Sequence, residues 1–193
     1  QECDLEMRAL HQHAEVLAVG ECGLDYFRDL APRPAQRKAF EQQLQLAVDL
    51  QKPLFLHQRD AHDDFIAMMK NFDGKLGKAV VHCFTGSKKE LYQCLDADFY
   101  IGITGWLCDE RRGLHLREMV ANIPSNRLMI ETDSPYLMPR SIKPMASHHR
   151  NEAMYLKHIV EELAKDRNES TEQAALHSTQ TAREFFGLKN TAC

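Results

Sequence analysis

Four short apolar runs in this chain each end in a side chain that is able to bind a metal ion. The runs cover residues 16–21, 53–57, 79–82 and 128–133, and the metal-capable side chains are Glu21, His57, His82 and Asp133. Stretches with helical spacing of apolar residues separate the runs. An alternation of apolar strands with such stretches predicts an α/β fold with parallel strands.

The spacing of apolar residues between the runs predicts the intervening helices. A stripe at spacings of three and four indicates a helix from Pro34 to about Gln51. Asp60 is expected to cap a second helix, and Ser87 with Glu90 has the form of a capping box for a third. Further helices are predicted near residues 2–12, 109–121, 152–165 and 171–186.

A fifth apolar stretch, Phe99–Thr104, predicts one more strand, which ends without a metal-capable side chain. Gly102 and Gly105 fit either a close approach of the backbone to a site or a bulge and a turn. The segment 134–150 contains three prolines and is interpreted as a loop over the site.

The predicted elements describe a parallel barrel or sheet; in a (β/α) barrel of the TIM type they would correspond to roughly the last five βα units. An open piece of five strands would expose two sheet edges and a large apolar face. We therefore expect that the chain, treated as a single barrel domain over residues 1–193, is an N-terminally shortened version of a longer protein.

Charge and cysteine content narrow the class of protein. The formal net charge is −4, which does not fit a protein that coats DNA non-specifically, although a metal centre can supply local positive charge. The six cysteines form no C-x-x-C pair, so we expect free thiols and a cytoplasmic location. Cys22 and Cys83, each next to a proposed ligand, are expected to point away from the metal. No apolar run is long enough to span a bilayer, so no membrane partner is expected.

The four metal-capable side chains are expected to converge on one site. In a (β/α) barrel the active site lies at the carboxyl ends of the strands. Two carboxylates and two imidazoles, here Glu21, Asp133, His57 and His82, can hold one or two divalent cations, which indicates a metal-dependent hydrolase. Taken singly, Glu21 fits a pair with an arginine equally well, and a lone histidine after a strand is more often a core residue.

Asp133 is the candidate catalytic residue, because an aspartate beside a metal-activated water can orient the water and accept its proton. Glu131 lies on the same side of that strand. It is expected either to form a buried ion pair or to contact a metal-ligating residue without binding the metal itself. Asp25 is expected to order the loop that follows Glu21.

Three further residues are candidates for binding substrate. Arg59 can contact a phosphate or pair with Asp60 or Asp63, and Arg150 can contact a phosphate near a helix start. Trp106 can stack on a terminal base, as aromatic residues do in single-strand binding, or serve the structure alone.

The order of these motifs closely resembles the TatD family of metal-dependent deoxyribonucleases over nearly the whole chain. The matching segments are GECGLD at 20–25, FLHQRDAH at 55–62, HCFTG at 82–86, YIGITGW at 100–106, ETDSPYL at 131–137 and RNE at 150–152. Each motif is short, but six in the same order are highly specific.

The resemblance implies a TIM-barrel metallohydrolase of the amidohydrolase type. Such an enzyme cuts DNA phosphodiester bonds, mainly as an exonuclease on single strands or ends, with Mg²⁺ or with Zn²⁺ or Mn²⁺. By position, Glu21 matches the family's bridging carboxylate, His57 and His82 its imidazole ligands, and Asp133 the aspartate that binds metal and activates water. The first three strands of the family and their His-x-His pair are not matched; His11-Gln12-His13 precedes the Glu21 strand and is rejected as that pair.

Two other functions stay open on the residues alone. The same motifs fit a metal-dependent amidase or lactonase that acts on a small molecule. The chain also fits an inactive metal-binding remnant of a barrel that lacks its first strands.

Overall fold

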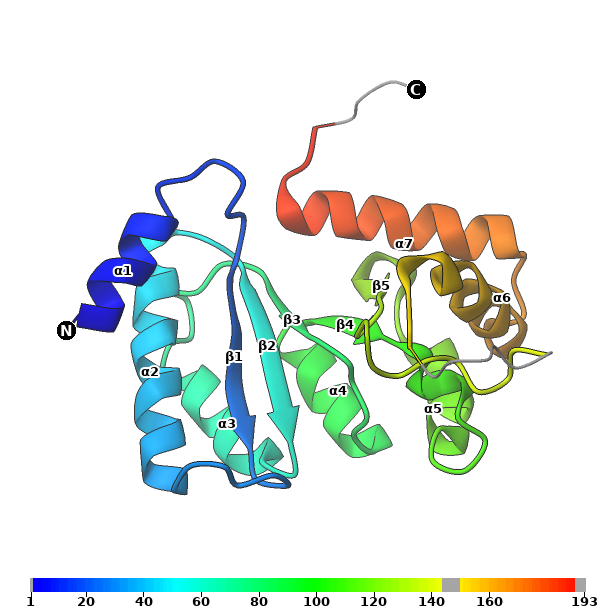
Figure 1. Cartoon of the computed structure of the whole chain (residues 1–193), viewed down its shortest axis with the longest axis horizontal. Coiled ribbons are helices and arrows are strands. Elements are labelled where there is room, and N and C mark those ends of the chain that lie inside the picture. Colours follow the sequence, from blue (N-terminus) through cyan, green and yellow to red (C-terminus); the bar gives the residue numbers. More distant parts are fainter. Residues whose placement is uncertain (1, 144–149, 190–193) are drawn as a thin grey trace. The chain divides into compact units, whose positions relative to one another are not determined.

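The computed structural model describes residues 2–143 and 150–189, and it has an α/β fold with five strands (Figure 1). The strands are hydrogen-bonded in chain order, and β1 with β2 and β4 with β5 pair in parallel. The predicted α/β class with parallel strands is therefore confirmed. The strands are β1 Val19–Asp25, β2 Leu54–Arg59, β3 Ala79–Val81, β4 Tyr100–Ile103 and β5 Leu128–Ile130.

Seven α-helices and four short 3₁₀ turns connect and follow the strands in the described part of the chain. The α-helices are α1 Glu2–Leu10, α2 Arg33–Leu50, α3 His62–Lys70, α4 Lys88–Asp96, α5 Leu114–Met119, α6 Leu156–Arg167 and α7 Thr171–Phe186. The 3₁₀ turns are η1 Gly105–Cys108, η2 Val120–Asn122, η3 Ser125–Arg127 and η4 Ala153–Tyr155. None of these helices is long and apolar enough to cross a membrane.

The chain divides into two compact units. Unit 1 contains the residues up to Val80 and those from Phe185 onward, and unit 2 is Val81–Glu184. In unit 1, α2 packs on β1 and α3 packs on β2, as Figure 1 shows. In unit 2, α6 packs against η1, η2 and β5. The expectation of one barrel domain over residues 1–193 stays a prediction.

Each unit has its own apolar core. In unit 1 the rings of Phe40 and Phe65 stack with their centroids 5.6 Å apart, and both side chains are fully buried. Leu44 and Ala47 of α2 are also buried, so the predicted apolar stripe of that helix is confirmed. In unit 2, Val160 and Ala164 of α6 form a cluster with Ala174 of α7.

Of the two helix caps predicted from the sequence, one forms and the other does not. Ser87 and Glu90 form the predicted capping box at the start of α4. Asp60 does not cap α3: it has a φ of 52°, and Ala61 takes the N-cap position without a side-chain bond. The prediction for Asp60 is wrong because the chain turns once more after β2 before the helix begins.

The predicted helix over residues 109–121 begins later, at Leu114. Asp109 is buried and accepts hydrogen bonds from the backbone N–H and the guanidinium of Arg111, with Arg112 donating to the same carboxylate. These contacts hold residues 109–113 in turns instead of a helix. Arg111 and Arg112 stay about half exposed to solvent while they pair with Asp109.

The segment predicted as a loop over the site has neither helix nor strand at residues 134–143. Its remaining residues 144–149 lie outside the described residues. Asn151, which follows, is buried and does not belong to a helix. Its side-chain amide donates to the carbonyl of Tyr136 at 2.7 Å. Its backbone N–H donates to the carbonyl of Pro135 at 3.0 Å, so Asn151 fixes the start of this loop.

Candidate functional site

A bulge in β1 sets the direction of Glu21. Gly20 pairs with Phe55 and Cys22 pairs with Leu56, so Glu21 has no partner position on β2. A bulge adds one residue to a strand and redirects the side chain that it carries. Glu21 is therefore on the exposed side of the strand, while Cys22 is buried. The strand continues to Asp25, so Glu21 lies within β1 and not at its end as predicted.

His57 lies within β2, between two carboxylates that both come from β1. Its Nδ1 atom is 3.0 Å from Oε1 of Glu21, and its Nε2 atom is 3.1 Å from Oδ2 of Asp25. The side chain of Glu21 is 47% exposed and that of Asp25 is 18% exposed. The imidazole thus has one solvent-facing and one inner carboxylate. The predicted neighbours Glu21 and His57 are brought together within unit 1.

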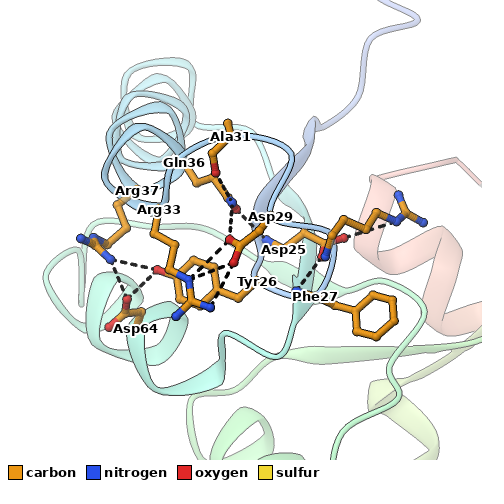
Figure 2. Close-up of polar contacts among 10 residues, drawn as sticks. Asp25, Tyr26, Phe27, Asp29, Ala31, Arg33, Gln36, Arg37 and Asp64 are labelled. Carbon is orange, nitrogen blue, oxygen red and sulfur yellow. Dashed lines mark hydrogen bonds and ion pairs between the residues drawn. The ribbon is translucent and has the colours of Figure 1, made fainter.

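Asp25 orders the loop after β1, as the sequence predicted (Figure 2). Its carboxylate also contacts His57. Its Oδ1 atom accepts from the backbone N–H groups of Phe27 at 3.1 Å and Arg28 at 2.7 Å. Burial opposes ionisation of Asp25, but the bonds from Arg28 and His57 outweigh it and hold the pKa of the carboxyl below its ordinary value. Asp25 is therefore a charged partner that fixes one nitrogen of the His57 ring.

A second polar network, shown in Figure 2, holds the same loop against α2 and α3. The phenol of Tyr26 donates to Asp64 at 2.5 Å, and Arg37 donates to both the phenol and the carboxylate. The guanidinium of Arg33 lies 4.2 Å from the centre of the Tyr26 ring. The loop that carries Asp25 is thus anchored by side chains of two helices.

Arg59, a predicted substrate-binding residue, is the last residue of β2. Its guanidinium lies 3.8 Å from the centre of the Phe27 ring, and Phe27 is exposed. An exposed aromatic ring can stack on a nucleic-acid base, and the arginine beside it can bind a phosphate. The sequence reasoning did not single out Phe27, and the signal for it is an aromatic residue directly after the Asp25 strand.

His82 directly follows β3 and is buried, in unit 2. Its Nδ1 atom is 2.9 Å from Oε1 of Glu131, and its Nε2 atom is 3.6 Å from Oδ1 of Asp133. Glu131 is 14% exposed and Asp133 is 37% exposed. The predicted neighbours His82 and Asp133 are brought together, and Glu131 lies behind the histidine as the sequence reasoning expected.

Gly102 of β4 makes room for Glu131. A Cβ atom on Gly102 would lie 2.1 Å from Oε1 of Glu131, closer than any contact between such atoms. The same carboxylate oxygen accepts from the backbone N–H of Cys83 at 2.5 Å. The close approach predicted for Gly102 is therefore confirmed, and it serves the carboxylate that contacts His82.

The same arrangement of one imidazole between two carboxylates occurs in both units. In each, the inner carboxylate (Asp25 or Glu131) orients one ring nitrogen, and the more exposed one (Glu21 or Asp133) lies beside the other nitrogen. Histidine ligands of metals are commonly oriented by such an inner carboxylate. The donor chemistry of both sets thus fits a divalent cation, although no group of three or more candidate ligands within the described residues has the geometry of a formed metal site.

The strand argument by which Cys22 and Cys83 were expected to point away from the metal applies to only one of the two. Cys22 is buried in β1, and burial raises the pKa of its thiol to about 12, which fits the predicted inert core thiol. Cys83 lies in a turn after β3 with a φ of 46°, because that strand ends at Val81. Because Cys83 lies outside the strand, the argument from side chains that alternate along a strand does not apply to it. Its Sγ atom is 3.2 Å from Oγ1 of Thr104.

The two remaining predicted substrate residues lie in unit 2. Trp106 is in η1, half-buried, with the guanidinium of Arg112 at 4.3 Å from its ring centre. Arg150 is exposed next to the buried Asn151. Sequence reasoning missed the group of arginines around Asp109 near Trp106; the available signal was the D-x-R-R pattern at 109–112.

Comparisons with known proteins agree with this fold and these motifs. A family model described as "TatD related DNase" matches residues 2–187. The "3'-5' ssDNA/RNA exonuclease TatD" proteins of Citrobacter rodentium and Klebsiella pneumoniae are each 49% identical to the chain, over 93% of the chain and 68% of the relative. The crystal structure of a TatD homologue from Escherichia coli K12 has a TM-score of 0.85 at 27% identity and covers 98% of this chain and 72% of that one.

The fold also extends to a more distant structure. An uncharacterised amidohydrolase from Saccharomyces cerevisiae has a TM-score of 0.82 at 21% identity, over 95% of this chain and 69% of that one. The fold, the paired imidazole and carboxylate groups and the family match together define an α/β hydrolase. The chain belongs to the TatD-related DNase family.

Proposed function

We propose that this chain is a metal-dependent nuclease that removes nucleotides from the 3′ ends of single-stranded DNA or RNA. The observation that carries the proposal is the imidazole held between two carboxylates, which occurs once in each unit and involves all four predicted ligands. Family membership and the names of the relatives support the substrate and the direction of digestion.

Glu21, His57, His82 and Asp133 are the residues that would hold the metal, as one or two divalent cations. Carboxylate oxygens favour Mg²⁺, and imidazole nitrogens also admit Zn²⁺ or Mn²⁺. Mg²⁺ is the cation that we assign. When bound, a divalent cation polarises the scissile phosphate and acidifies water.

The residues of the chain supply the remaining steps. Asp25 and Glu131 hold the imidazoles of His57 and His82 in one orientation, so that the second ring nitrogen of each is presented to a ligand. Asp133 accepts the proton of the attacking water as general base, because its carboxylate is the more exposed of the two beside His82. Arg59, Arg150 and Trp106 bind the phosphates and bases of the strand.

The cytoplasm is the compartment that we assign. Cys22, Cys83, Cys94 and Cys108 are free thiols, which persist in a reducing environment. The partner that we expect is the nucleic-acid substrate.

The test uses a single-stranded oligonucleotide labelled at its 5′ end, with Mg²⁺ present. We expect labelled products that shorten stepwise from the 3′ end. Asp133→Asn removes the general base and is expected to lower turnover about 10²–10⁴-fold. Asp96→Asn, the same chemical change at an exposed position of α4, serves as the matched control and is expected to keep wild-type turnover.

Two outcomes would contradict the proposal. Near-wild-type turnover in Asp133→Asn would refute the role of that residue. Hydrolysis of small esters or lactones, without shortening of any oligonucleotide in Mg²⁺, Mn²⁺ or Zn²⁺, would favour an amidase or lactonase over a nuclease.

A further inference from the structure

A pocket of about 370 Å³ lies in unit 2 between the 3₁₀ turn after β4 and the loop after β5. Its lining includes Trp106, Asp109, Arg111, Arg112 and Arg140, together with Leu137, Met138 and Pro139. Its volume falls in the range of small-molecule sites in proteins. The lining of the pocket thus combines guanidinium groups with apolar side chains.

Three arginines in this pocket share one carboxylate. Arg111 donates to both oxygens of Asp109, at 3.1 and 3.0 Å, and Arg112 donates twice to Oδ2, at 3.2 and 3.1 Å. The Nε atom of Arg140 is 3.8 Å from Oδ1, which is an ion pair without a hydrogen bond. Three positive charges against one negative charge leave two positive charges among the lining residues, in a chain whose net charge is −4.

Asp109 organises the pocket and is not itself available to a ligand. Its side chain is almost fully buried, and the bond from Arg111 with the added bond from Arg112 holds the pKa of its carboxyl far below the ordinary value. All three arginine side chains are about half exposed. Each guanidinium has five N–H donors, of which Arg111 and Arg112 each use two on Asp109. Each of these two guanidinium groups therefore has three N–H donors that do not bind Asp109.

The backbone shapes this pocket tightly at two glycines. A Cβ atom on Gly105 would lie 2.3 Å from the carbonyl oxygen of Leu137, and one on Gly113 would lie 2.2 Å from that of Trp106. The first glycine lets the loop after β5 contact the turn after β4, and the second lets the Asp109 turn fold back on Trp106. The pocket is therefore built by the backbone and not by chance contacts of surface side chains.

The pocket and the candidate catalytic residue are carried by the same segment of unit 2. The segment 133–140 begins at Asp133 and ends at Arg140, and the N–H of Tyr136 donates to the carbonyl of Asp133 at 2.7 Å. The loop that supplies Leu137, Met138, Pro139 and Arg140 to the pocket thus starts at the proposed general base.

We propose that this pocket binds a nucleotide of the substrate strand, next to the one that is cleaved. Arg111 and Arg140 bind an internucleotide phosphate, as guanidinium forks do. Arg112, stacked on Trp106, fixes the indole, and the Leu137–Pro139 segment packs against the sugar or base. This inference rests on the proposed nuclease function, because it names the subsite that such an enzyme uses to hold its strand.

The test combines Arg111→Gln with Arg140→Gln, which removes the two phosphate contacts and leaves Arg112 on both Asp109 and Trp106. Arg127→Gln is the matched control, because Arg127 also pairs with an aspartate, Asp98, and lies 4.8 Å from the ring centre of Tyr100, but precedes β5. Binding of a fluorescent oligo-dT is measured by anisotropy in EDTA, where no cleavage occurs. Hydrolysis of bis(p-nitrophenyl) phosphate is measured with Mg²⁺, because this small diester reports the metal-dependent chemistry without a strand.

In the double variant we expect the Kd for oligo-dT to rise at least about tenfold, since hydrogen bonds to charged groups are lost. The slope of log Kd against log salt should become shallower by about 0.7, the value for one single-strand phosphate. Hydrolysis of the small diester should stay at the wild-type rate, and Arg127→Gln should leave all three quantities unchanged.

An unchanged Kd and salt slope in the double variant would overturn the proposal. If the double variant does not fold, Arg140→Gln alone decides, because Arg140 makes no hydrogen bond to Asp109. The failure of the nuclease function is distinguishable, since it would appear as an inactive wild-type protein, whereas the EDTA binding series still reports whether the pocket holds a strand.

Discussion

In each unit the candidate histidine, His57 or His82, has two unequal carboxylate partners. Asp25 and Glu131 are the inner ones, and both are held by backbone N–H groups: Asp25 by Phe27 and Arg28, Glu131 by Cys83. A carboxylate that is fixed in this way fixes in turn the ring that it contacts. The precision of the site therefore depends on residues that bind no substrate and no metal.

Gly102→Ala tests this dependence on the inner carboxylate. The added methyl group would overlap Glu131, whose carboxylate must shift and thereby release His82. We expect phosphodiester hydrolysis to fall about 10–100-fold, the usual effect of losing an outer partner of a metal ligand. The melting temperature should change little, because a flexible side chain can move aside. Gly77→Ala is the control, since no atom lies within 4 Å of its Cβ position, and equal rates in both variants would refute the role of Glu131.

Asp109 gives the molecule a pH dependence on the acid side. The bonds from Arg111 and Arg112 lower the pKa of Asp109 in the folded state, whereas an unfolded aspartate titrates near about 3.9. Its contribution to the free energy of unfolding is therefore complete above about pH 4 and is lost as the pH falls toward the folded-state pKa. Asp109→Asn lacks this titration.

We expect Asp109→Asn to be less stable than the wild type at pH 7 and the difference to shrink below about pH 4. Urea unfolding of both proteins at pH 7, 4, 3 and 2.5 measures it. A difference that is independent of pH would show that Asp109 does not titrate in the way its arginine partners imply.

The sequence predicted which candidate residues pair better than it predicted their surroundings. Glu21, His57, His82 and Asp133 became candidates because each closes an apolar run, which is a local signal, and the structure brings them together as the pairs Glu21–His57 and His82–Asp133. The inner role of Asp25 was missed because it depends on two residues, Asp25 and His57, that meet only when β1 and β2 pair. The arginine pocket was missed because the spacing of residues 109–121 resembles a helix, and a buried carboxylate that orders a turn has no periodic signature.

At the scale of elements, the strands show where apolar patterning stops being informative. β1 and β2 run on to Asp25 and Arg59 even though their last residues are polar. Backbone pairing between neighbouring strands does not depend on apolar side chains, so each strand extends beyond its apolar run. The bulge at Glu21 could likewise not be predicted from the sequence, because it arises from the register of β1 against β2.

A single arginine at the end of α6 binds the turns that follow α5. Arg167 is buried and donates to the carbonyls of Val120 at 2.6 Å and Ile123 at 2.8 Å, and to the hydroxyl of Ser125 at 3.0 Å. Its Nε atom also donates to Glu169 at 2.6 Å. It therefore satisfies acceptors of η2, of the residue after η2 and of η3 at once.

Arg167→Ala should lower the free energy of unfolding by about 3–5 kcal/mol, because it leaves Glu169 and several carbonyl oxygens without their donor. Lys165→Ala is the control in the same helix turn: Lys165 pairs with Glu162 but is exposed, and little change is expected. Urea unfolding followed by circular dichroism measures both. Equal, small effects of the two substitutions would show that the contacts of Arg167 add no net stability.

At the scale of the whole molecule, charge is distributed unevenly. The chain carries 28 acidic and 24 basic residues, and yet three arginines line one pocket beside the loop of Asp133. A negative chain repels nucleic acid in general, so binding must come from such local groups and from bound cations. Low affinity without metal and a steep dependence on divalent cation follow from this distribution.

The last prediction concerns the metal and the stability of the whole chain. A cation that binds only the folded state stabilises it, by about 2.7 kcal/mol at 100 times its Kd, which corresponds to a melting temperature raised by about 5–10 °C. His57→Ala in unit 1 and His82→Ala in unit 2 should each weaken this rise, measured by calorimetry with Mg²⁺ or Mn²⁺ against EDTA. His13→Ala is the matched control, because His13 is exposed and was rejected as a ligand. If the melting temperature of the wild type is the same with and without the cation, an inactive remnant is favoured instead. A working metal site must stabilise the folded state.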